Sequence, residues 1–169
     1  IKIFLVYSLE AEGKEYRLTT PQTFAAWDED NDVPDYPSPY GIAGWTDDDQ
    51  SILIKDRYDI WKFDPIAASS PVNLTVNGRK EQITYSLIQL DREKRAYNTS
   101  EAQYLTGFNE RTKGSGYYTT RLNKPVAPKA LLAGNFKLAA LAKAKDANAV
   151  IYSTKNKDVN SAHIQVGYA

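Results

Sequence analysis

A repeated order of strand and turn segments constrains the fold of this chain more than any single motif does. Each unit has an apolar strand, a polar turn rich in Asp and Lys, a returning strand, a charged turn and an aromatic third strand. Comparable strands begin at Ser51, Gln103 and Ala149, a repeat of roughly 50 residues, and four-stranded propeller blades repeat every ~40–50 residues. The pattern predicts an all-β fold, a partial β-propeller of about three four-stranded antiparallel blades.

The repeat also suggests how the 169 residues, a length typical of one domain, are organised. A β-sandwich is the alternative, because it too has short strands with turn signals every ~8–12 residues. The shared order of turn chemistry favours the propeller. We expect a single partial propeller domain with a blade remnant at residues 1–24, an acidic and proline-rich connection at 25–40, blades at 41–76 and 83–133, and an incomplete blade at 136–169.

Strand positions follow from the same units. Residues 129–145 are rich in Ala and Leu, which suits a helix, but Gly134 interrupts them and the repeat places strands there. We therefore predict strands, and a long polar turn at residues 91–102. The predicted strands are residues 2–9, 15–19, 42–45, 51–55, 58–64, 72–75, 84–90, 103–108, 117–122, 129–132, 137–142, 149–154 and 163–168.

Composition excludes several classes of function. The 21 basic residues balance 21 acidic ones, so no long-range field favours nucleic acid or anionic membranes. No apolar run approaches the ~20 residues of a membrane span. The chain has no Cys, which removes disulfides and zinc–thiolate sites. It also has no Met and opens at Ile1, from which we expect a fragment of a longer protein.

Two groups of polar residues are candidates for chemistry. His163 is the sole histidine, and without Cys or a second His it cannot build a zinc site. Asp28, Asp30 and Asp32 alternate as in a calcium loop. Val33 and Pro39 stand where that loop needs Gly and Glu, so a solvated acidic loop is the main interpretation. We therefore assign no catalytic, cofactor-binding or metal-binding residue.

Other Asp and aromatic residues have structural interpretations. Residues 47–49 follow Trp45 and are expected to stabilise a tight turn through backbone hydrogen bonds. Asp56 and Asp59 flank Arg57, which suggests an ion pair within a turn. The aromatic residues are expected to pack between blades, with a sugar-binding platform as the alternative; they are Trp45, Tyr58, Trp61 and Phe63.

Two segments resemble a known family. Residues 37–46, Pro-Ser-Pro-Tyr-Gly-Ile-Ala-Gly-Trp-Thr, and residues 56–61, Asp-Arg-Tyr-Asp-Ile-Trp, are similar to the N-terminal propeller of prolyl oligopeptidase-like serine peptidases of Bacteroides-type bacteria. Residues 71–75 and 108–110 agree with the same pattern, whereas residues 157–169 match no part of it.

The resemblance implies a propeller of seven or eight blades that caps an α/β-hydrolase domain, whose catalytic Ser lies in a G-x-S-x-G motif. This chain lacks that motif, because Gly114-Ser115-Gly116 has the wrong spacing. The resemblance therefore implies a non-catalytic segment that gates peptide access to an active site on a hydrolase domain absent from this chain. It further implies peptide substrates and a location in the periplasm or cell envelope.

Alternatives to the peptidase role remain open. The abundance of Tyr and Trp beside Asp-rich turns suits a stand-alone carbohydrate- or protein-binding β module. The many carboxylates suit, more weakly, a small β-barrel enzyme with an acid–base pair. A partial propeller leaves strand edges open, so we also expect self-association through those edges.

Overall fold

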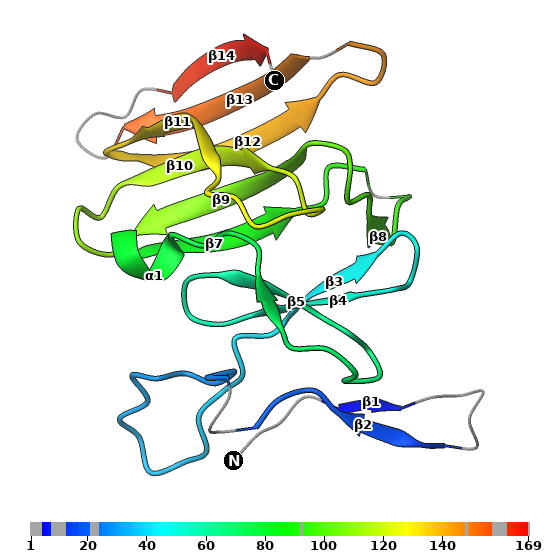
Figure 1. Cartoon of the computed structure of the whole chain (residues 1–169). Coiled ribbons are helices and arrows are strands. Elements are labelled where there is room, and N and C mark those ends of the chain that lie inside the picture. The colour runs from blue at the N-terminus through cyan, green and yellow to red at the C-terminus, as the bar shows by residue number, and fades with distance from the viewer. Residues whose placement is uncertain are drawn as a thin grey trace.

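The computed structural model describes residues 5–7, 13–20, 24–91, 93–147, 149–156 and 162–168. Within these residues the chain forms strands β1 to β14 and one short helix, α1, and the strands make four sheets. Figure 1 shows the sheets following one another in chain order, from the blue N-terminal end to the red C-terminal end. The prediction of a mostly β fold is confirmed.

The N-terminal part holds the smallest sheet, a pair of antiparallel strands. These are β1 (Leu5–Tyr7) and β2 (Glu15–Arg17). The predicted strand at residues 2–9 is described only over β1. Beyond β2, an isolated bridge between Trp27 and Pro39 closes a loop around the acidic residues. The proline-rich connection thus stays outside the sheets, as expected for a segment with few backbone donors.

The second sheet begins as an antiparallel meander. It consists of β3 (Ile42–Thr46), β4 (Ile52–Lys55), β5 (Ile60–Phe63) and β6 (Val72–Asn73). A fifth strand, β8 (Ala96–Tyr97), comes from later in the chain and pairs in parallel with β3. The prediction of a plain polar turn at residues 91–102 is wrong at β8, because two residues are too few to give a periodic signal.

The third sheet is a four-stranded antiparallel meander in the order β11-β10-β9-β7. Its strands are β7 (Ile83–Ile88), β9 (Gln103–Asn109), β10 (Ser115–Thr120) and β11 (Lys129–Gly134). Each overlaps a strand predicted from the repeat. Helix α1 (Gly78–Glu81), which the sequence analysis did not foresee, connects the second sheet to the third.

The fourth sheet contains three antiparallel strands. They are β12 (Phe136–Lys143), β13 (Ala149–Asn156) and β14 (Ala162–Tyr168). Only Asn135 separates β11 from β12, so the Ala- and Leu-rich stretch is strand, as predicted, rather than helix. Residues 157–161 and 169 of the expected incomplete blade lie outside the described residues.

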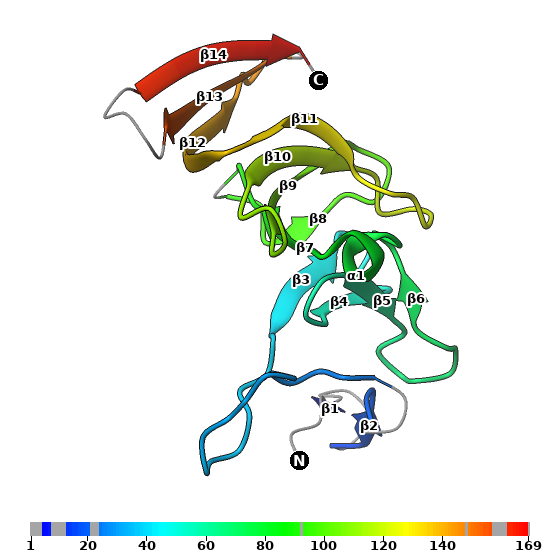
Figure 2. The same cartoon turned by 90° about the vertical axis from the view of Figure 1, so that its left-hand side faces the viewer.

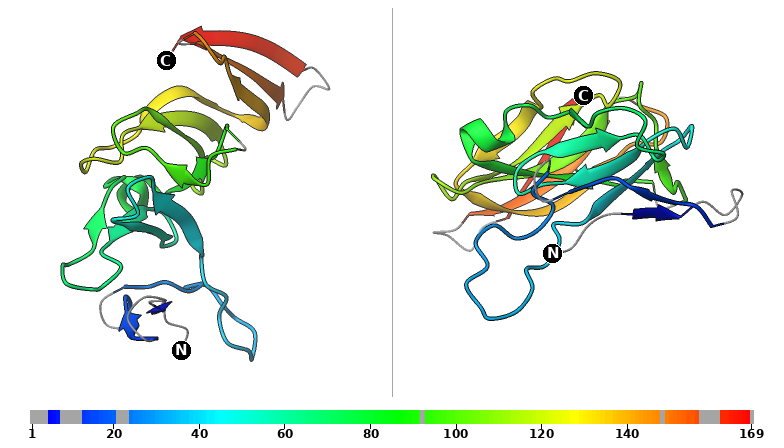
Figure 3. Two further views of the ribbon diagram at one scale, coloured as in Figure 1. Left: turned by 90° about the vertical axis from the view of Figure 1, so that its right-hand side faces the viewer. Right: turned by 60° about the horizontal axis from the view of Figure 1, so that its bottom comes forward.

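The second, third and fourth sheets stack face to face, as Figure 2 and the left view of Figure 3 show. Alternation along β4 explains this arrangement: Leu53 points to a core shared with the third sheet, while Ile52 and Ile54 point to a core shared with the N-terminal segment. Successive side chains of a strand face opposite sides of its sheet. Both faces of the second sheet are therefore buried.

The third sheet uses the same alternation in β10. Tyr118 joins the core against the second sheet, where its ring lies edge-on to Tyr85 at 5.3 Å between centroids. The ring of Tyr117 lies 6.1 Å from that of Tyr152 in β13. The four sheets form an open stack with no closed sheet, so the ring arrangement of a propeller remains a proposal.

Candidate functional site

The acidic loop between Trp27 and Pro39 is fastened to the sheets by two arginines. Asp28 donates its backbone N–H to the carbonyl of Ser38 at 2.8 Å, which ties the two arms of the loop together. The carboxylate of Asp30 lies 2.6 Å from the guanidinium of Arg57. The loop is exposed, as predicted, and two of its carboxylates, those of Glu29 and Asp30, pair with arginines of the protein itself.

Arg57 joins this loop to the turn between β9 and β10. Its guanidinium donates to both carboxylate oxygens of Glu110, at 3.2 and 3.0 Å, and Tyr58 donates its hydroxyl to the same group at 2.7 Å. Hydrogen bonds to Asp30 and Glu110 raise the pKa of Arg57. Burial alone would raise the pKa of Glu110, but hydrogen bonds from Arg57 and Tyr58 outweigh it and lower the pKa.

This pairing corrects one prediction. The sequence analysis paired Arg57 with its chain neighbours Asp56 and Asp59, but Arg57 binds carboxylates 27 residues before it and 53 residues after it. Asp56 accepts instead from Arg79 at 3.3 Å, and Arg79 also pairs with Glu29 at 3.0 Å. Ion pairs between residues far apart in the chain cannot be predicted from the sequence, because no local pattern links the two residues.

Asp59 has a different role as a buried acceptor. Its carboxylate is 1% exposed. It accepts from the Thr75 hydroxyl at 2.6 Å and from the backbone N–H groups of Gly78 at 2.9 Å and Arg79 at 3.1 Å. Asp59 thereby joins the turn before β5 to the segment that begins α1. Its hydrogen bonds stabilise the fold.

The remaining Asp and aromatic candidates also have structural partners. Asp48 accepts from the Thr46 hydroxyl and the Gln50 backbone, and these hydrogen bonds lower its pKa, as expected for a turn-stabilising group. Trp45 and Trp61 are half-buried against the core that contains Phe63. Tyr58 is buried as well. These aromatic residues are thus buried or half-buried, while their packing between propeller blades stays a prediction.

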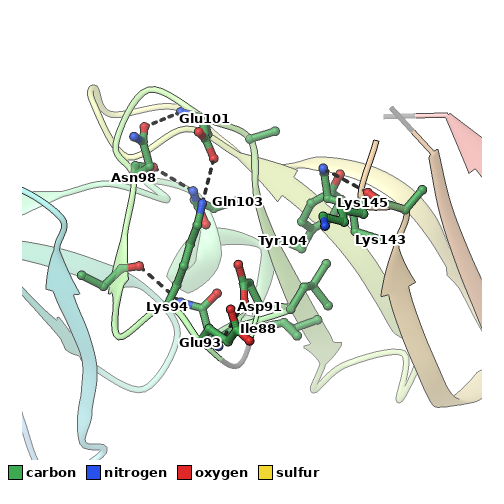
Figure 4. Close-up of a pocket in the computed structure, with 15 residues that line it drawn as sticks. Ile88, Asp91, Glu93, Lys94, Asn98, Glu101, Gln103, Tyr104, Lys143 and Lys145 are labelled. Carbon is green, nitrogen blue, oxygen red and sulfur yellow. Dashed lines mark hydrogen bonds and ion pairs between the residues drawn. The ribbon is translucent and has the colours of Figure 1, made fainter. Parts of the chain in front are cut away.

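A cleft lies between the third and fourth sheets and is shown in Figure 4. Its volume is about 630 Å³. The ends of β7 and β9 contribute Ile88 and Tyr104, the following loop contributes Asp91 and Glu93, and the turn after β12 contributes lysines. We call this the inter-sheet cleft. The sequence analysis missed it, because its walls come from separate repeat units.

The inter-sheet cleft carries charges of both signs. Lys143 and Lys145 lie on the side of the fourth sheet, next to Tyr104 in Figure 4. Asp91 and Glu93 lie on the loop that leads from β7 to β8. Tyr104 is 4% exposed, and burial raises the pKa of its hydroxyl. Such a lining suits noncovalent recognition of a charged ligand.

Within the described ranges, no group of three or more His, Asp or Glu side chains could hold a metal ion. No helix in that part of the chain is long and apolar enough to cross a membrane. His163 lies in β14 opposite Thr154, and its side chain is outside the described part. Comparison with protein-family models, curated proteins and solved structures gave no match.

Proposed function

We propose that this chain is a non-catalytic segment of a β-propeller, with the second, third and fourth sheets as consecutive blades. The observation that carries this proposal is the stacking of antiparallel meanders in chain order, each packed face to face on the next. Propellers arrange such sheets radially around a channel. The parallel β3–β8 pair, which joins one sheet to the next, also suits neighbouring blades.

The parent protein that we propose is a prolyl oligopeptidase-like serine peptidase located in the periplasm or cell envelope. The resemblance of residues 37–46 and 56–61 supports it. In such a protein this segment would gate peptide access to an active site on another domain. Selectivity would then depend on the geometry and charge of the channel, because a gate discriminates without making or breaking bonds.

The proposal predicts that the chain itself is chemically inert. Purified protein should hydrolyse no fluorogenic proline-containing peptide, and a serine-directed fluorophosphonate probe should not label it. A prolyl oligopeptidase sample in the same assay serves as the positive control. Peptide hydrolysis that copurifies with this chain and persists after treatment with the fluorophosphonate probe would contradict the proposal.

The genetic context offers an independent test. The reading frame that encodes these residues should continue into a strand–turn–helix segment with a G-x-S-x-G motif. A frame that lacks any hydrolase domain would reject the peptidase role and leave the propeller arrangement standing.

A stand-alone binding module is the second candidate, and the inter-sheet cleft is the observation that favours it. Ligand pockets generally have volumes of roughly 300–1,000 Å³, and this cleft lies in that range. Saturable binding to the isolated chain together with a frame that encodes no hydrolase domain would favour this candidate over the gate.

A further inference from the structure

The lining of the inter-sheet cleft contains both apolar and charged side chains. Its apolar residues are Ile88 at the end of β7, Leu90 in the loop after it and Tyr104 near the start of β9, and we call them the floor. Asp91 and Glu93 stand on one wall, and Lys143 and Lys145 on the other. Since the two walls belong to different sheets, a ligand in the cleft would contact both sheets at once.

The charges on both walls are available for a ligand. Within the described residues, neither lysine has a carboxylate at ion-pair distance; the Lys143 ammonium donates only to the Ala144 carbonyl at 3.4 Å. The same holds for the two carboxylates, which have no cation that close in the described ranges. The single ion pair among the residues that line the cleft joins Lys94 and Glu101 at 3.8 Å.

The turn that carries the acidic wall is ordered by its own hydrogen bonds. The side chain of Asp91 accepts a hydrogen bond from the backbone N–H of Glu93 at 3.0 Å. The backbone carbonyl of Asp91 accepts one from the backbone N–H of Lys94 at 3.2 Å. These bonds leave the Glu93 carboxylate and one oxygen of Asp91 without a donor in the described part of the chain.

We propose that the inter-sheet cleft binds short peptides with free termini in extended form. The carboxylate end faces Lys143 and Lys145, the ammonium end faces Asp91 and Glu93, and small apolar side chains lie over the floor. An extended tripeptide spans about 10 Å. A zwitterion can pair with both walls, which carry opposite charges, whereas a singly charged ligand can pair with only one of them. The inference deepens the proposed peptide-handling role and rests on it for the class of ligand.

Titration of the whole ¹⁵N-labelled chain with Ala-Val-Ala tests the proposal by NMR. Shifts should concentrate at residues 88–104 and 143–145 and saturate. N-acetylated and C-amidated forms should each bind several-fold more weakly, and the doubly blocked form weakest of all. Equal binding of all four forms would refute recognition of the termini. Preference for the acetylated form alone would indicate an anion site and overturn the proposal.

Charge-removing variants identify the walls. Lys143→Gln/Lys145→Gln should weaken Ala-Val-Ala binding roughly tenfold, since two exposed ion pairs together contribute about 1.4 kcal/mol. It should also abolish the difference between the free and amidated peptides. Asp91→Asn/Glu93→Gln should abolish the difference between the free and acetylated peptides.

Matched controls are Lys80→Gln/Lys137→Gln and Glu15→Gln, which remove exposed charges outside the cleft. They should leave the binding unchanged. If both cleft variants bind as the unmodified chain does, the assignment of the walls is wrong. Peptide binding is measured on the isolated chain, whereas the peptidase role is tested by the reading frame and the fluorophosphonate probe. A failure of the peptide-binding proposal can therefore be told apart from a failure of the peptidase role.

Discussion

Asp59 illustrates how one residue organises the junction between two sheets. Its buried carboxylate accepts three hydrogen bonds, two of them from the backbone where α1 begins. Gly78 is required at this position, because a Cβ there would lie 2.6 Å from the Asp59 carboxylate oxygen and 2.8 Å from the Tyr58 carbonyl. The close approach of backbone and carboxylate leaves no room for a side chain.

Removal of this acceptor should be costly. Asp59→Ala leaves a hydroxyl and two backbone donors without partners in a buried place, so the free energy of unfolding should fall by roughly 3 kcal/mol. Urea denaturation measures it. Asp32→Ala, at an exposed position, is the control and should change it by less than about 0.5 kcal/mol. Similar losses for both variants would contradict the role given to Asp59.

Glu110 should make stability depend on pH. Its pKa is lowered in the folded chain, so its contribution is present above the unfolded pKa of about 4.3 and is lost as pH falls through the folded value. Glu110→Gln should cost about 1 kcal/mol at neutral pH, and the difference from the unmodified chain should shrink in acid. Urea denaturation across this pH range measures both.

Glu101→Gln is the matched control for Glu110, because the Glu101 carboxylate is exposed and lies 3.8 Å from Lys94, its one cation partner among the described residues. It should have little effect on unfolding at any pH. A Glu110→Gln cost that persists unchanged in acid would argue against the ion pair as its source.

At the scale of elements, β8 is the feature that ties one sheet to the next. Its residue Tyr97 packs on Gly44 of β3, where a Cβ would lie 2.8 Å from the ring. Gly44 also has a φ of +149°, a backbone conformation that other residues rarely adopt. Both requirements select glycine at this point of β3.

Alanine substitutions at two glycines separate the effect of the positive φ from that of the close contact with the Tyr97 ring. Gly41 has a φ of +105° with open space around it, so Gly41→Ala should cost only its backbone strain, about 1–2 kcal/mol. Gly44→Ala should cost about 2 kcal/mol more, because the ring of Tyr97 must move. Thermal unfolding measures both variants.

A double-mutant cycle isolates the contact with Tyr97. In a Tyr97→Ala background the excess cost of Gly44→Ala over Gly41→Ala should largely disappear. An excess that survives the loss of the ring would place its origin in the backbone of β3.

The sequence predicted elements far better than contacts between them. The strands of the third sheet were foreseen because their turns recur in one order, and the strands at residues 129–145 because the repeat outweighed helix propensity. α1 and β8 were missed, since four and two residues carry no periodicity. Arg57 was assigned to neighbouring carboxylates because ion pairs between distant segments leave no local trace, and the inter-sheet cleft was missed for the same reason.

For the whole molecule, tyrosine is a main component of the packing between sheets. Burial is the chief cause that raises the pKa of seven tyrosine hydroxyls, and that of Tyr85 reaches about 12, with the nearby Tyr118 contributing. Tyr85, Tyr97 and Tyr118 lie in the core between the second and third sheets, and Tyr117 lies against Tyr152 of the fourth sheet. Ionisation of the phenols therefore opposes the folded stack.

Alkaline titration should show this dependence. A raised folded pKa contributes stability that is present below the unfolded value of about 10 and is lost as pH rises through the folded values. Unfolding should thus begin above about pH 10 and coincide with a cooperative rise in tyrosinate absorbance. A smooth, noncooperative titration of all tyrosines would contradict the packing described.

The single residue between β11 and β12 has a consequence for evolution and engineering. A tether of one peptide unit at Asn135 gives the fourth sheet almost no slack relative to the third. An insertion or deletion there should displace the fourth sheet, and the turn that carries the lysines should move with it. The inter-sheet cleft would then become wider or narrower. We therefore expect the length of this junction to change the size of ligand that the cleft admits, without any change in the side chains that line it.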